Sequence, residues 1–229
     1  MSKSSYRLEI YSDGGASQKH AKYPDIGGTG TALRLVNNYT KEYTNLIAMQ
    51  FTTHPTTNNQ MELFAAIMGL QIANELLDTE EYEITDIFWA TDSQYTLKGI
   101  TDWIKNWKKN KWRTSDRKPV KNKPLWVYFD KLYTGITTEQ RQKIVHKWVK
   151  GHNGHEMNEF CDKLANLAYI NERWEGKADL KSVQRIAERF NFTNPVLGFM
   201  TLNLRDFPTA FNTAESMEDF VQSLVEQVA

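Results

Sequence analysis

Four acidic residues stand at positions from which a fold can bring distant side chains together. Three of them follow a predicted strand or open a predicted helix, and one lies in the first half of a later helix: Asp13, Asp92, Glu62 and Asp162. Strand ends and helix starts commonly converge on one edge of an α/β sheet. We therefore expect the four carboxylates to form one cluster, which is stable only when protons or cations neutralise it.

Taken one at a time, these acids have simpler explanations. Asp13 before Gly14 could form a turn, and Asp92 with Ser93 could cap a helix. Glu62 could interact favourably with the N-terminal end of its own helix. Only the combination of the four acids in their contexts favours a functional site.

The segment KGHNGHEMNEFCDKLA, residues 150–165, adds two histidines and the single cysteine of the chain. Oxygen ligands without cysteine or several histidines suit Mg²⁺ or Mn²⁺ rather than Zn²⁺, so neither His152 nor His155 is needed as a ligand. His152 lies in a glycine-rich loop, where an imidazole could accept or deliver a proton near neutral pH. We expect His155 to be a helix-start residue and Cys161 to be a small buried one.

Hydrophobic spacing predicts the elements that position these residues. Strands are predicted at residues 6–12, 28–36, 43–51, 84–91 and 143–149. Helices are predicted at residues 59–77, from Ser93 onward, at 124–132 and at 154–172. The first strand should stop at Asp13, and the strand at 84–91 is apolar enough to be central. This order predicts an α/β fold with a mixed five-stranded sheet and flanking helices.

Composition indicates an ordinary globular protein, since 40% of the 229 residues are hydrophobic and 24% are charged. The 28 Lys and Arg balance 28 Asp and Glu, which argues against a uniformly basic nucleic-acid-binding protein. Between residues 98 and 123, however, basic residues greatly outnumber the acids Asp102 and Asp116. No apolar run is long enough to span a bilayer, no secretion signal is present, and one cysteine excludes an internal disulfide. We expect a cytoplasmic protein with no membrane partner.

Four motifs occur in the order in which type 1 ribonuclease H carries them. They are YSDGGA at 11–16, TTNNQMEL at 56–63, ATDSQY at 90–95 and WVKGHNGHEMNEFCDKLA at 148–165. With them, GITDWIKNWKKNKWRTSDRKPVKNKPLW at 99–126 resembles the basic protrusion, or handle, of that family. The resemblance covers about residues 6–172 and makes residues 1–174 a catalytic domain. The loop after Asp13 differs from the usual family sequence and looks longer.

The resemblance implies a ribonuclease H-like fold in which the first three strands are antiparallel and the last two are parallel to the first. It implies hydrolysis of the RNA strand of RNA–DNA hybrids, leaving 5′-phosphate and 3′-hydroxyl ends. Carried over by position, the metal-binding acids are Asp13, Glu62, Asp92 and Asp162, which would hold two Mg²⁺ with substrate, or Mn²⁺ in their place. His152 matches the mobile catalytic histidine of the family.

The same resemblance implies two groups of substrate-binding residues. Short polar side chains beside the acids would reach the minor groove of the hybrid: Thr57, Asn58, Asn59 and Gln94. Handle residues would follow its phosphates: Trp103, Trp107, Lys108 and Lys109. Structural roles stay open for some of them, because Asn58 or Asn59 could cap the long helix and Trp103 could pack the handle onto the body.

Residues 175–229 have no counterpart in the minimal enzyme and form a C-terminal extension. Helical stripes at 179–190 and 217–228 predict that it is mostly helical, and it could pack on the body, fold separately or bind a protein partner. The alternatives to an active ribonuclease H are an integrase-like nuclease, an inactive hybrid-binding module, and the ribonuclease H part of a reverse transcriptase. The GHNGHEMNE segment and the handle disfavour the integrase-like nuclease, and the four intact acids disfavour the inactive module. The start of the chain shortly before the first strand disfavours the reverse transcriptase.

Overall fold

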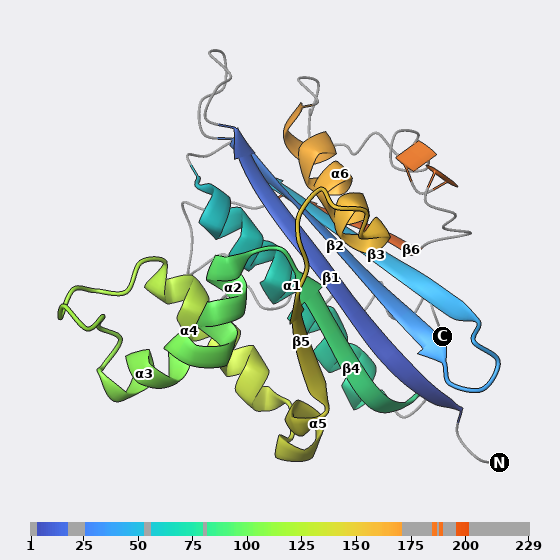
Figure 1. Ribbon diagram of the computed structural model, residues 1–229, viewed down its shortest axis with the longest axis horizontal. Helices are drawn as coiled ribbons and strands as arrows, with labels where there is room; N and C mark the ends of the chain where they lie inside the picture. The colour runs from blue at the N-terminus through green and yellow to red at the C-terminus, as the bar shows by residue number, and fades with distance from the viewer. Residues whose placement is uncertain are drawn as a thin grey trace.

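The computed structural model describes residues 4–17, 26–52, 56–79, 82–170, 185–186, 188–189 and 196–201. In this part of the chain a twisted sheet carries helices on both faces (Figure 1). Its strands are β1 (Ser5–Ser17), β2 (Ile26–Asn37), β3 (Tyr43–Thr52), β4 (Glu83–Thr91), β5 (Ile144–Trp148) and β6 (Val196–Thr201). They lie in the order β5-β4-β1-β2-β3-β6.

The pairing of the first five strands confirms the predicted mixed sheet. β1, β2 and β3 pair antiparallel, while β4 runs parallel to β1 and β5 runs parallel to β4. β4 lies between β5 and β1, so both of its edges are paired, as its apolar sequence predicts. β6 was not predicted: it comes from the extension and pairs parallel with β3 at the edge of the sheet.

The predicted end of the first strand at Asp13 is wrong. β1 continues through Ser17, and Asp13 lies within it, paired with Gly30 of β2. Gly14 serves close packing here, because a Cβ at this position would lie 2.1 Å from the carbonyl carbon of Met61 in the long helix. The glycine therefore lets that helix approach β1 rather than turning the chain, and this approach brings the acids of the two elements together.

The helices of the described residues are α1 (Asn58–Asp78), α2 (Gln94–Lys98), α3 (Ile104–Lys109), α4 (Lys123–Gly135), α5 (Thr138–Gln142) and α6 (Glu156–Ile170). A π-helical turn, Gly99–Trp103, joins α2 to α3. The four predicted helical regions are confirmed within a few residues. The short α5 and the π-helical turn were not predicted.

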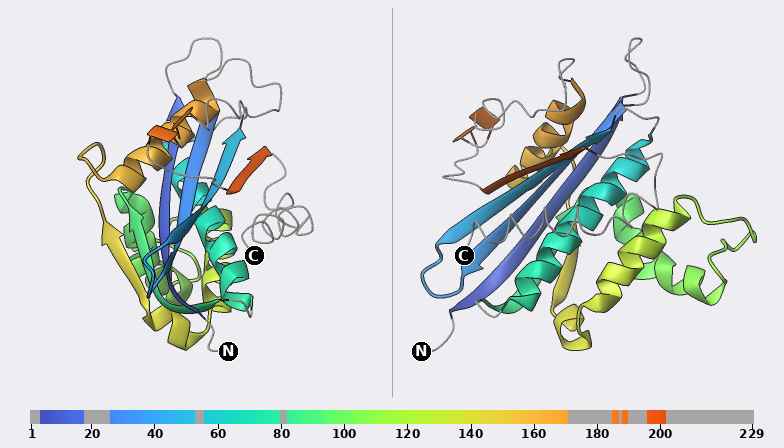
Figure 2. Two further views of the ribbon diagram at one scale, coloured as in Figure 1. Left: turned by 90° about the vertical axis from the view of Figure 1, so that its right-hand side faces the viewer. Right: turned by 180° about the vertical axis from the view of Figure 1, so that it is seen from behind.

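Alternation along the strands divides the core between the two faces of the sheet (Figure 2). On one face α1 and α4 cover a large cluster that includes Leu8, Ile10 and Leu33. On the other face α6 covers a smaller cluster, to which β1 and β2 contribute Tyr11 and Ala32. The fold thereby holds α1 and α6 on opposite faces of the same strand, β1.

The handle at residues 99–126 begins with the π-helical turn, and its α3 and the loop that follows project from the body beside α4 (Figure 1). Its attachment is aromatic: the Trp107 ring lies 5.5 Å from the ring of Trp126, a fully buried residue of α4. Trp126 in turn lies 5.4 Å from Tyr95 of α2. The basic segment is thus anchored to the hydrophobic core at its base.

The predicted boundary near residue 174 stays a prediction. Within the extension, the helical stripe at 179–190 is described only at residues 185–186 and 188–189, which are helical. The stripe at 217–228 lies outside the described residues. Among the described residues, no helix is long and apolar enough to cross a membrane.

Candidate active site

The four predicted acids come from four different elements and lie in one electrostatic environment. Asp13 is on β1, Glu62 on α1, Asp92 directly after β4 and Asp162 on α6. Burial is the main cause that raises the pKa of Asp13 to about 8, and the charges of Asp92, Asp162 and Glu62 also contribute to this rise. The pKa of Glu62 is raised mainly by burial, and the charge of Asp92 adds to it. The structure therefore brings the four carboxylates together, as the sequence predicts.

Each of these carboxylates accepts a hydrogen bond from a neutral donor. The main-chain N–H of Gly14 donates to Asp13 at 2.7 Å, and the Nδ2 of Asn166 donates to Asp162 at 2.7 Å. Two side chains donate to Glu62: Ser93 Oγ at 2.6 Å and Asn58 Nδ2 at 2.9 Å. Asn158 Nδ2 donates to Asp92 Oδ2 at 3.1 Å. These bonds orient the acids without neutralising their charge.

The donor set fits a hard divalent cation. Among the described residues no lysine or arginine forms an ion pair with any of the four acids, so their mutual repulsion has no basic side chain to balance it. All of the candidate ligands are carboxylate oxygens, which Mg²⁺ and Mn²⁺ prefer. In the described part of the chain no three His, Cys, Asp or Glu side chains form a closed metal-binding group as they stand.

His152 lies at the rim of this cluster. Its side chain is 80% exposed, and its Nδ1 lies 3.9 Å from Asp162 Oδ2. Its φ of 51° places it in the left-handed region, within the turn between β5 and α6. An exposed imidazole beside a carboxylate of the cluster can exchange protons with solvent and with groups bound at the site.

The start of α1 differs in detail from the prediction. Thr57, rather than Asn58 or Asn59, is the N-cap, and it forms a capping box with Gln60. Glu62 is the fifth residue of the helix, so it lies beyond the first turn in which it was predicted. Asn58 instead joins two elements, since it accepts from the main-chain N–H of Ala16 at 3.3 Å while it donates to Glu62.

The remaining residues predicted to bind in the minor groove are on the surface. Asn59 is exposed on the first turn of α1, and Gln94 is exposed at the start of α2. Thr57 and Asn58 are exposed as well, although both make the contacts described above. Their location beside Glu62 and Asp92 is compatible with contact to a bound nucleic acid.

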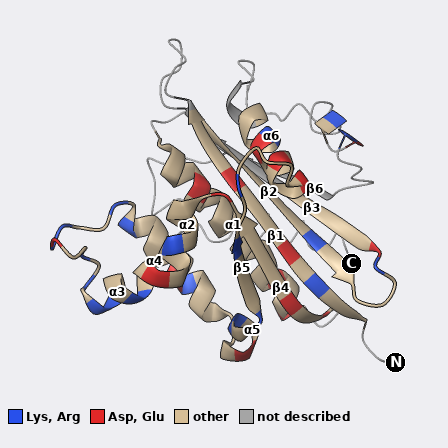
Figure 3. Cartoon of the chain, viewed as in Figure 1, with Lys and Arg blue, Asp and Glu red and all other residues tan. Residues whose placement is uncertain are grey.

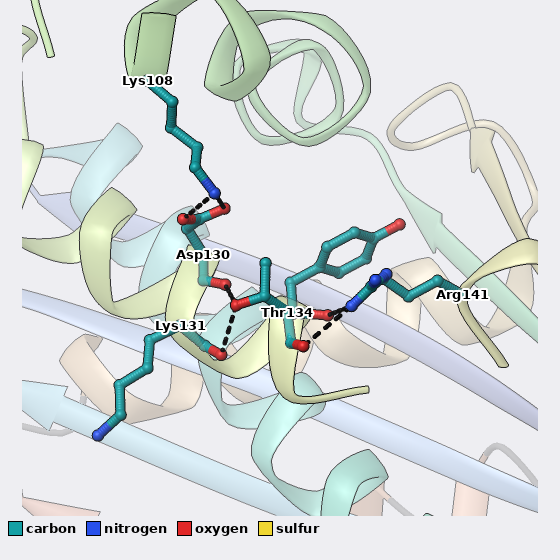
Figure 4. Close-up of polar contacts among 6 residues, drawn as sticks. Lys108, Asp130, Lys131, Thr134 and Arg141 are labelled. Atoms are coloured by element: carbon teal, nitrogen blue, oxygen red, sulfur yellow. Dashed lines mark hydrogen bonds and ion pairs between the residues drawn. The ribbon is translucent and has the colours of Figure 1, made fainter. Parts of the chain in front are cut away.

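The four predicted handle residues have different surroundings. The rings of Trp103 and Trp107 lie 5.6 Å apart, and both are partly buried. Lys108 forms an ion pair with Asp130 of α4, with 2.7 Å between Nζ and Oδ2 (Figure 4). Lys109 is exposed and forms no ion pair within the described residues. Of these four, Lys109 has the side chain most available to a phosphate.

The end of α4 below this ion pair is closed by Arg141 (Figure 4). Its Nη1 donates to the carbonyl oxygens of Tyr133 at 3.2 Å and Thr134 at 3.0 Å. These carbonyls belong to the last turn of the helix, where they have no partner within it. Two charged side chains thus bind α4, the helix beside the handle: Lys108 through Asp130, and Arg141 through the carbonyl oxygens of the last turn.

Charge is distributed unevenly over the described residues. Figure 3 shows Lys and Arg concentrated on α3 and the loop beyond it, while acidic residues lie on the sheet and on α6. α2 connects the two regions along the chain, because Asp92 directly precedes it and the π-helical turn and α3 follow it. An extended polyanion could therefore be held at the handle while one of its phosphates approaches the acids.

Two residues of the segment 150–165 have the structural roles that were predicted for them. His155 precedes α6, accepts from the main-chain N–H of Asn158 at 3.4 Å, and packs its ring 5.7 Å from that of Tyr11. Cys161 is fully buried and free, and burial raises the pKa of its thiol well above the usual value. Neither residue contributes a ligand to the cluster.

Several residues around the acids were not predicted from the sequence. Ser93, Trp148, Gly151, Asn158 and Asn166 each contact one of the four acids. Serine and asparagine are common in loops and helices, so their types gave no signal. Ser93 lies in the motif that contains Asp92, and Trp148, Gly151 and Asn158 lie in the motif that contains Asp162, whereas Asn166 lies just outside both.

The comparisons with known proteins agree with this geometry. The family model described as RNase H matches residues 5–170. The chain belongs to the ribonuclease H family. A ribonuclease H of Nitrosomonas eutropha is 44% identical over 161 residues, which cover 70% of this chain and 88% of that protein. A ribonuclease HI of Vibrio vulnificus is 41% identical over 165 residues, covering 72% and 90%.

Solved structures show the same fold. The crystal structure of LC9-RNase H1, a type 1 RNase H, superposes with a TM-score of 0.53 at 22% identity and covers 72% of each chain. The ribonuclease H match ends at Ile170, the last residue of α6, so β6 and the rest of the extension lie beyond it.

Proposed function

We propose that this ribonuclease H hydrolyses the RNA strand of RNA–DNA hybrids as an endonuclease and leaves 5′-phosphate and 3′-hydroxyl ends. The family supports the reaction, since relatives of this chain over most of their length are ribonucleases H. The observation that supports the site is the convergence of Asp13, Glu62, Asp92 and Asp162 without a lysine or arginine partner among the described residues. A cytoplasmic location is part of the same proposal.

Two Mg²⁺ ions, or Mn²⁺ in their place, would be held by these four carboxylates when the hybrid is bound. Such ions lower the pKa of an attacking water and neutralise the negative charge that develops at the phosphate and at the leaving 3′ oxygen. Asp13 is central among the acids, because its pKa responds to the charge of all three others. We therefore infer that Asp13 would be a ligand of the bound metal, with Glu62, Asp92 and Asp162 as the other ligands.

His152 would handle a proton at the rim of the site. It is on an exposed loop, and its Nδ1 lies 3.9 Å from Asp162 Oδ2, so its ring is open to solvent beside one of the four acids. Proton transfer by a positioned histidine contributes about 10²- to 10⁴-fold to a rate. His152→Ala should therefore lower the turnover number strongly without abolishing cleavage, and an unchanged rate across pH would exclude the role.

Recognition of the hybrid would rest on shape and on the 2′-hydroxyl groups rather than on base sequence. Thr57, Asn58, Asn59 and Gln94 offer short polar groups on the surface beside the acids. The handle would hold the phosphates further along the duplex, with Lys109 as its most available basic group. Binding of a protein partner through the extension stays a prediction.

The deciding experiment presents the full chain with labelled substrates. These are an RNA–DNA hybrid, the same RNA as a duplex, single-stranded RNA and duplex DNA, each with Mg²⁺ and with EDTA. Cleavage of the hybrid RNA strand alone, and only with Mg²⁺, supports the proposal. Tight hybrid binding without cleavage would instead indicate an inactive binding module, and cleavage of duplex DNA would indicate an integrase-like nuclease.

A further inference from the structure

Asp92 is enclosed by a single segment of the chain, residues 148–158, which also carries His152. We propose that Trp148, Gly151 and Asn158 of this segment are positioning residues that fix the main chain and the carboxylate of Asp92 for cation binding. This inference rests on the proposed function, because it concerns an acid assigned there to metal binding. The contacts that carry it come from three independent positions, each described in turn.

Trp148 fixes the main chain of Asp92. Its indole Nε1 donates to the carbonyl oxygen of Asp92 at 3.0 Å, and the neighbouring Val149 N–H donates to Thr91 at 3.1 Å. The end of β5 thereby continues to hold the chain beyond the last residue of β4. Trp148 remains 43% exposed, so burial of its ring alone does not account for a tryptophan at this position.

Gly151 leaves room for the carboxylate of Asp92. A Cβ at this position would lie 2.6 Å from Asp92 Oδ2, which is closer than real Cβ contacts allow. Its backbone has no left-handed φ, so the absence of a side chain serves the approach to Asp92 rather than the turn. Gly154 in the same loop is the opposite case: its φ is 79°, and a Cβ there would meet no atom within 4 Å.

Asn158 holds the other side of the carboxylate. It is only 2% exposed, and its Nδ2 donates to Asp92 Oδ2, the oxygen that also faces Gly151. Its own Oδ1 is buried without a hydrogen-bond partner. A buried amide with an unpaired oxygen is costly to stability, which suits a role in orienting Asp92 better than a role in stabilising α6.

One of the three contacts acts on the main chain of Asp92 and two act on its carboxylate, and they come from the end of β5, the loop after it and the start of α6. They leave the Asp92 carboxylate little freedom to rotate, and they tie its position to the loop on which His152 lies. Residues that orient a metal ligand typically change metal affinity or activity by about 10- to 100-fold when they are replaced. Each replacement should therefore act on cation binding more than on hybrid binding.

The test compares the full chain with Gly151→Ala, Gly154→Ala and Gly135→Ala. Mg²⁺ alone is titrated into each protein while NMR follows the backbone amides and the Trp148 indole N–H, and the turnover number and KM for the hybrid are measured separately. Gly135→Ala is the control for an added methyl group, because nothing lies within 4 Å of its Cβ position and the residue is at the end of α4. Gly154→Ala is the control for a perturbed loop.

We expect Gly151→Ala to weaken Mg²⁺ binding and to lower the turnover number by about 10-fold or more, to shift the Trp148 indole resonance, and to change KM by less than about threefold. Gly135→Ala and Gly154→Ala should bind Mg²⁺ as the unmodified chain does. Unchanged Mg²⁺ affinity in Gly151→Ala would overturn the inference. An equal loss in Gly154→Ala would also overturn it, since the loop conformation rather than contact with Asp92 would then be the cause.

Two further variants keep the test decisive if Gly151→Ala does not fold. Trp148→Phe and Asn158→Ala each remove one hydrogen bond to Asp92, and both should weaken Mg²⁺ binding. Retained affinity in both variants would contradict the inference. A failure of the proposed function would be seen in the unmodified chain, which would then not cleave the hybrid. The Mg²⁺ affinities of the variants could still be compared with that of the unmodified chain, so the two failures are distinguishable.

Discussion

Ser93 donates its hydroxyl to Glu62 Oε2 at 2.6 Å and so joins the residue after Asp92 to the long helix α1. Ser93 is also the N-cap of α2, since its Oγ accepts a hydrogen bond from the main-chain N–H of Thr96 at 3.0 Å. Ser93 is only 4% exposed, so neither bond competes with bulk water. The Ser93 side chain thus links Glu62 to the segment that carries Asp92, and it also caps α2, the helix that leads to the handle.

Ser93→Ala should reduce both stability and activity. Loss of an N-cap costs about 1 kcal/mol of the free energy of unfolding, and loss of an orienting bond to a metal ligand costs about 10-fold in turnover. Chemical denaturation and initial rates on the hybrid measure the two effects. Ser93→Thr keeps a hydroxyl at this position and should recover most of both, whereas equal losses in Ser93→Thr and Ser93→Ala would argue against the hydroxyl as the cause.

His146 makes stability depend on pH at a place remote from the acids. Its ring lies 5.7 Å from that of Trp89 and 6.3 Å from that of Tyr133, and its Nε2 has no hydrogen-bond partner. Burial lowers the pKa of His146 to about 4 in the folded protein. The unfolded chain therefore binds a proton here from about pH 6.5 downward, while the folded protein does so only near pH 4.

This difference predicts a loss of stability of about 3 kcal/mol as the pH falls from 6.5 to 4, with no further loss from this residue below that window. His146→Phe retains an aromatic ring without the titration. The free energy of unfolding of that variant should fall less steeply with pH across the same window. Parallel stability curves for the two proteins would show that His146 is not the source.

Lys108 and Lys109 should differ in how they affect hybrid binding, although they are adjacent. Lys108 is paired with Asp130, and because the lysine side chain is 45% exposed the pair contributes at most about 1 kcal/mol to stability. Lys109→Ala should lower the slope of log affinity against log salt concentration by about 1, and Lys108→Ala should lower it by clearly less. Lys131→Ala, on α4, is the control of equal charge. Equal slopes for the Lys108 and Lys109 variants would contradict this assignment.

Asp13→Asn should stabilise the chain in the absence of divalent ions. The pKa of Asp13 is raised to about 8, so ionisation is unfavourable in the folded protein while the unfolded chain ionises near pH 4. Stability from this group is therefore lost as pH rises from about 4 to 8, and a neutral amide avoids the loss. With EDTA at pH 7, thermal unfolding of Asp13→Asn should occur at a higher temperature than that of the unmodified chain. A lower unfolding temperature for Asp13→Asn would show that the charge of Asp13 does not destabilise the metal-free protein.

The order of the longer elements could be predicted because their apolar residues are numerous. In α1 they extend from Met61 to Leu76, and in β4 they form the stretch IFWA before Asp92. The short α5 and the edge strand β6 lacked such a signal, since five or six residues span too few periods. Pairing of β6 with β3 also depends on a tertiary contact across the whole chain, which local sequence does not encode.

The identities of the acids could be predicted from motifs, but their orientation could not. Asp13-Gly14 resembles a turn by composition, yet the glycine packs against α1 within a continuing strand. Likewise Thr57 rather than its asparagine neighbours caps α1, because the capping box with Gln60 satisfies two main-chain groups at once. The contacts of Asn158 and Gly151 with Asp92 span a distance in sequence at which spacing rules give no guidance.

Cleavage of a labelled RNA–DNA hybrid by the unmodified chain and by Asp13→Asn, each with Mg²⁺ and with excess EDTA, tests most directly whether the four acids form one cation-dependent catalytic site. The RNA strand should be cut only by the unmodified chain with Mg²⁺, while Asp13→Asn stays folded and still binds the hybrid. Substantial cutting by Asp13→Asn, or cutting by the unmodified chain in EDTA, would contradict the account.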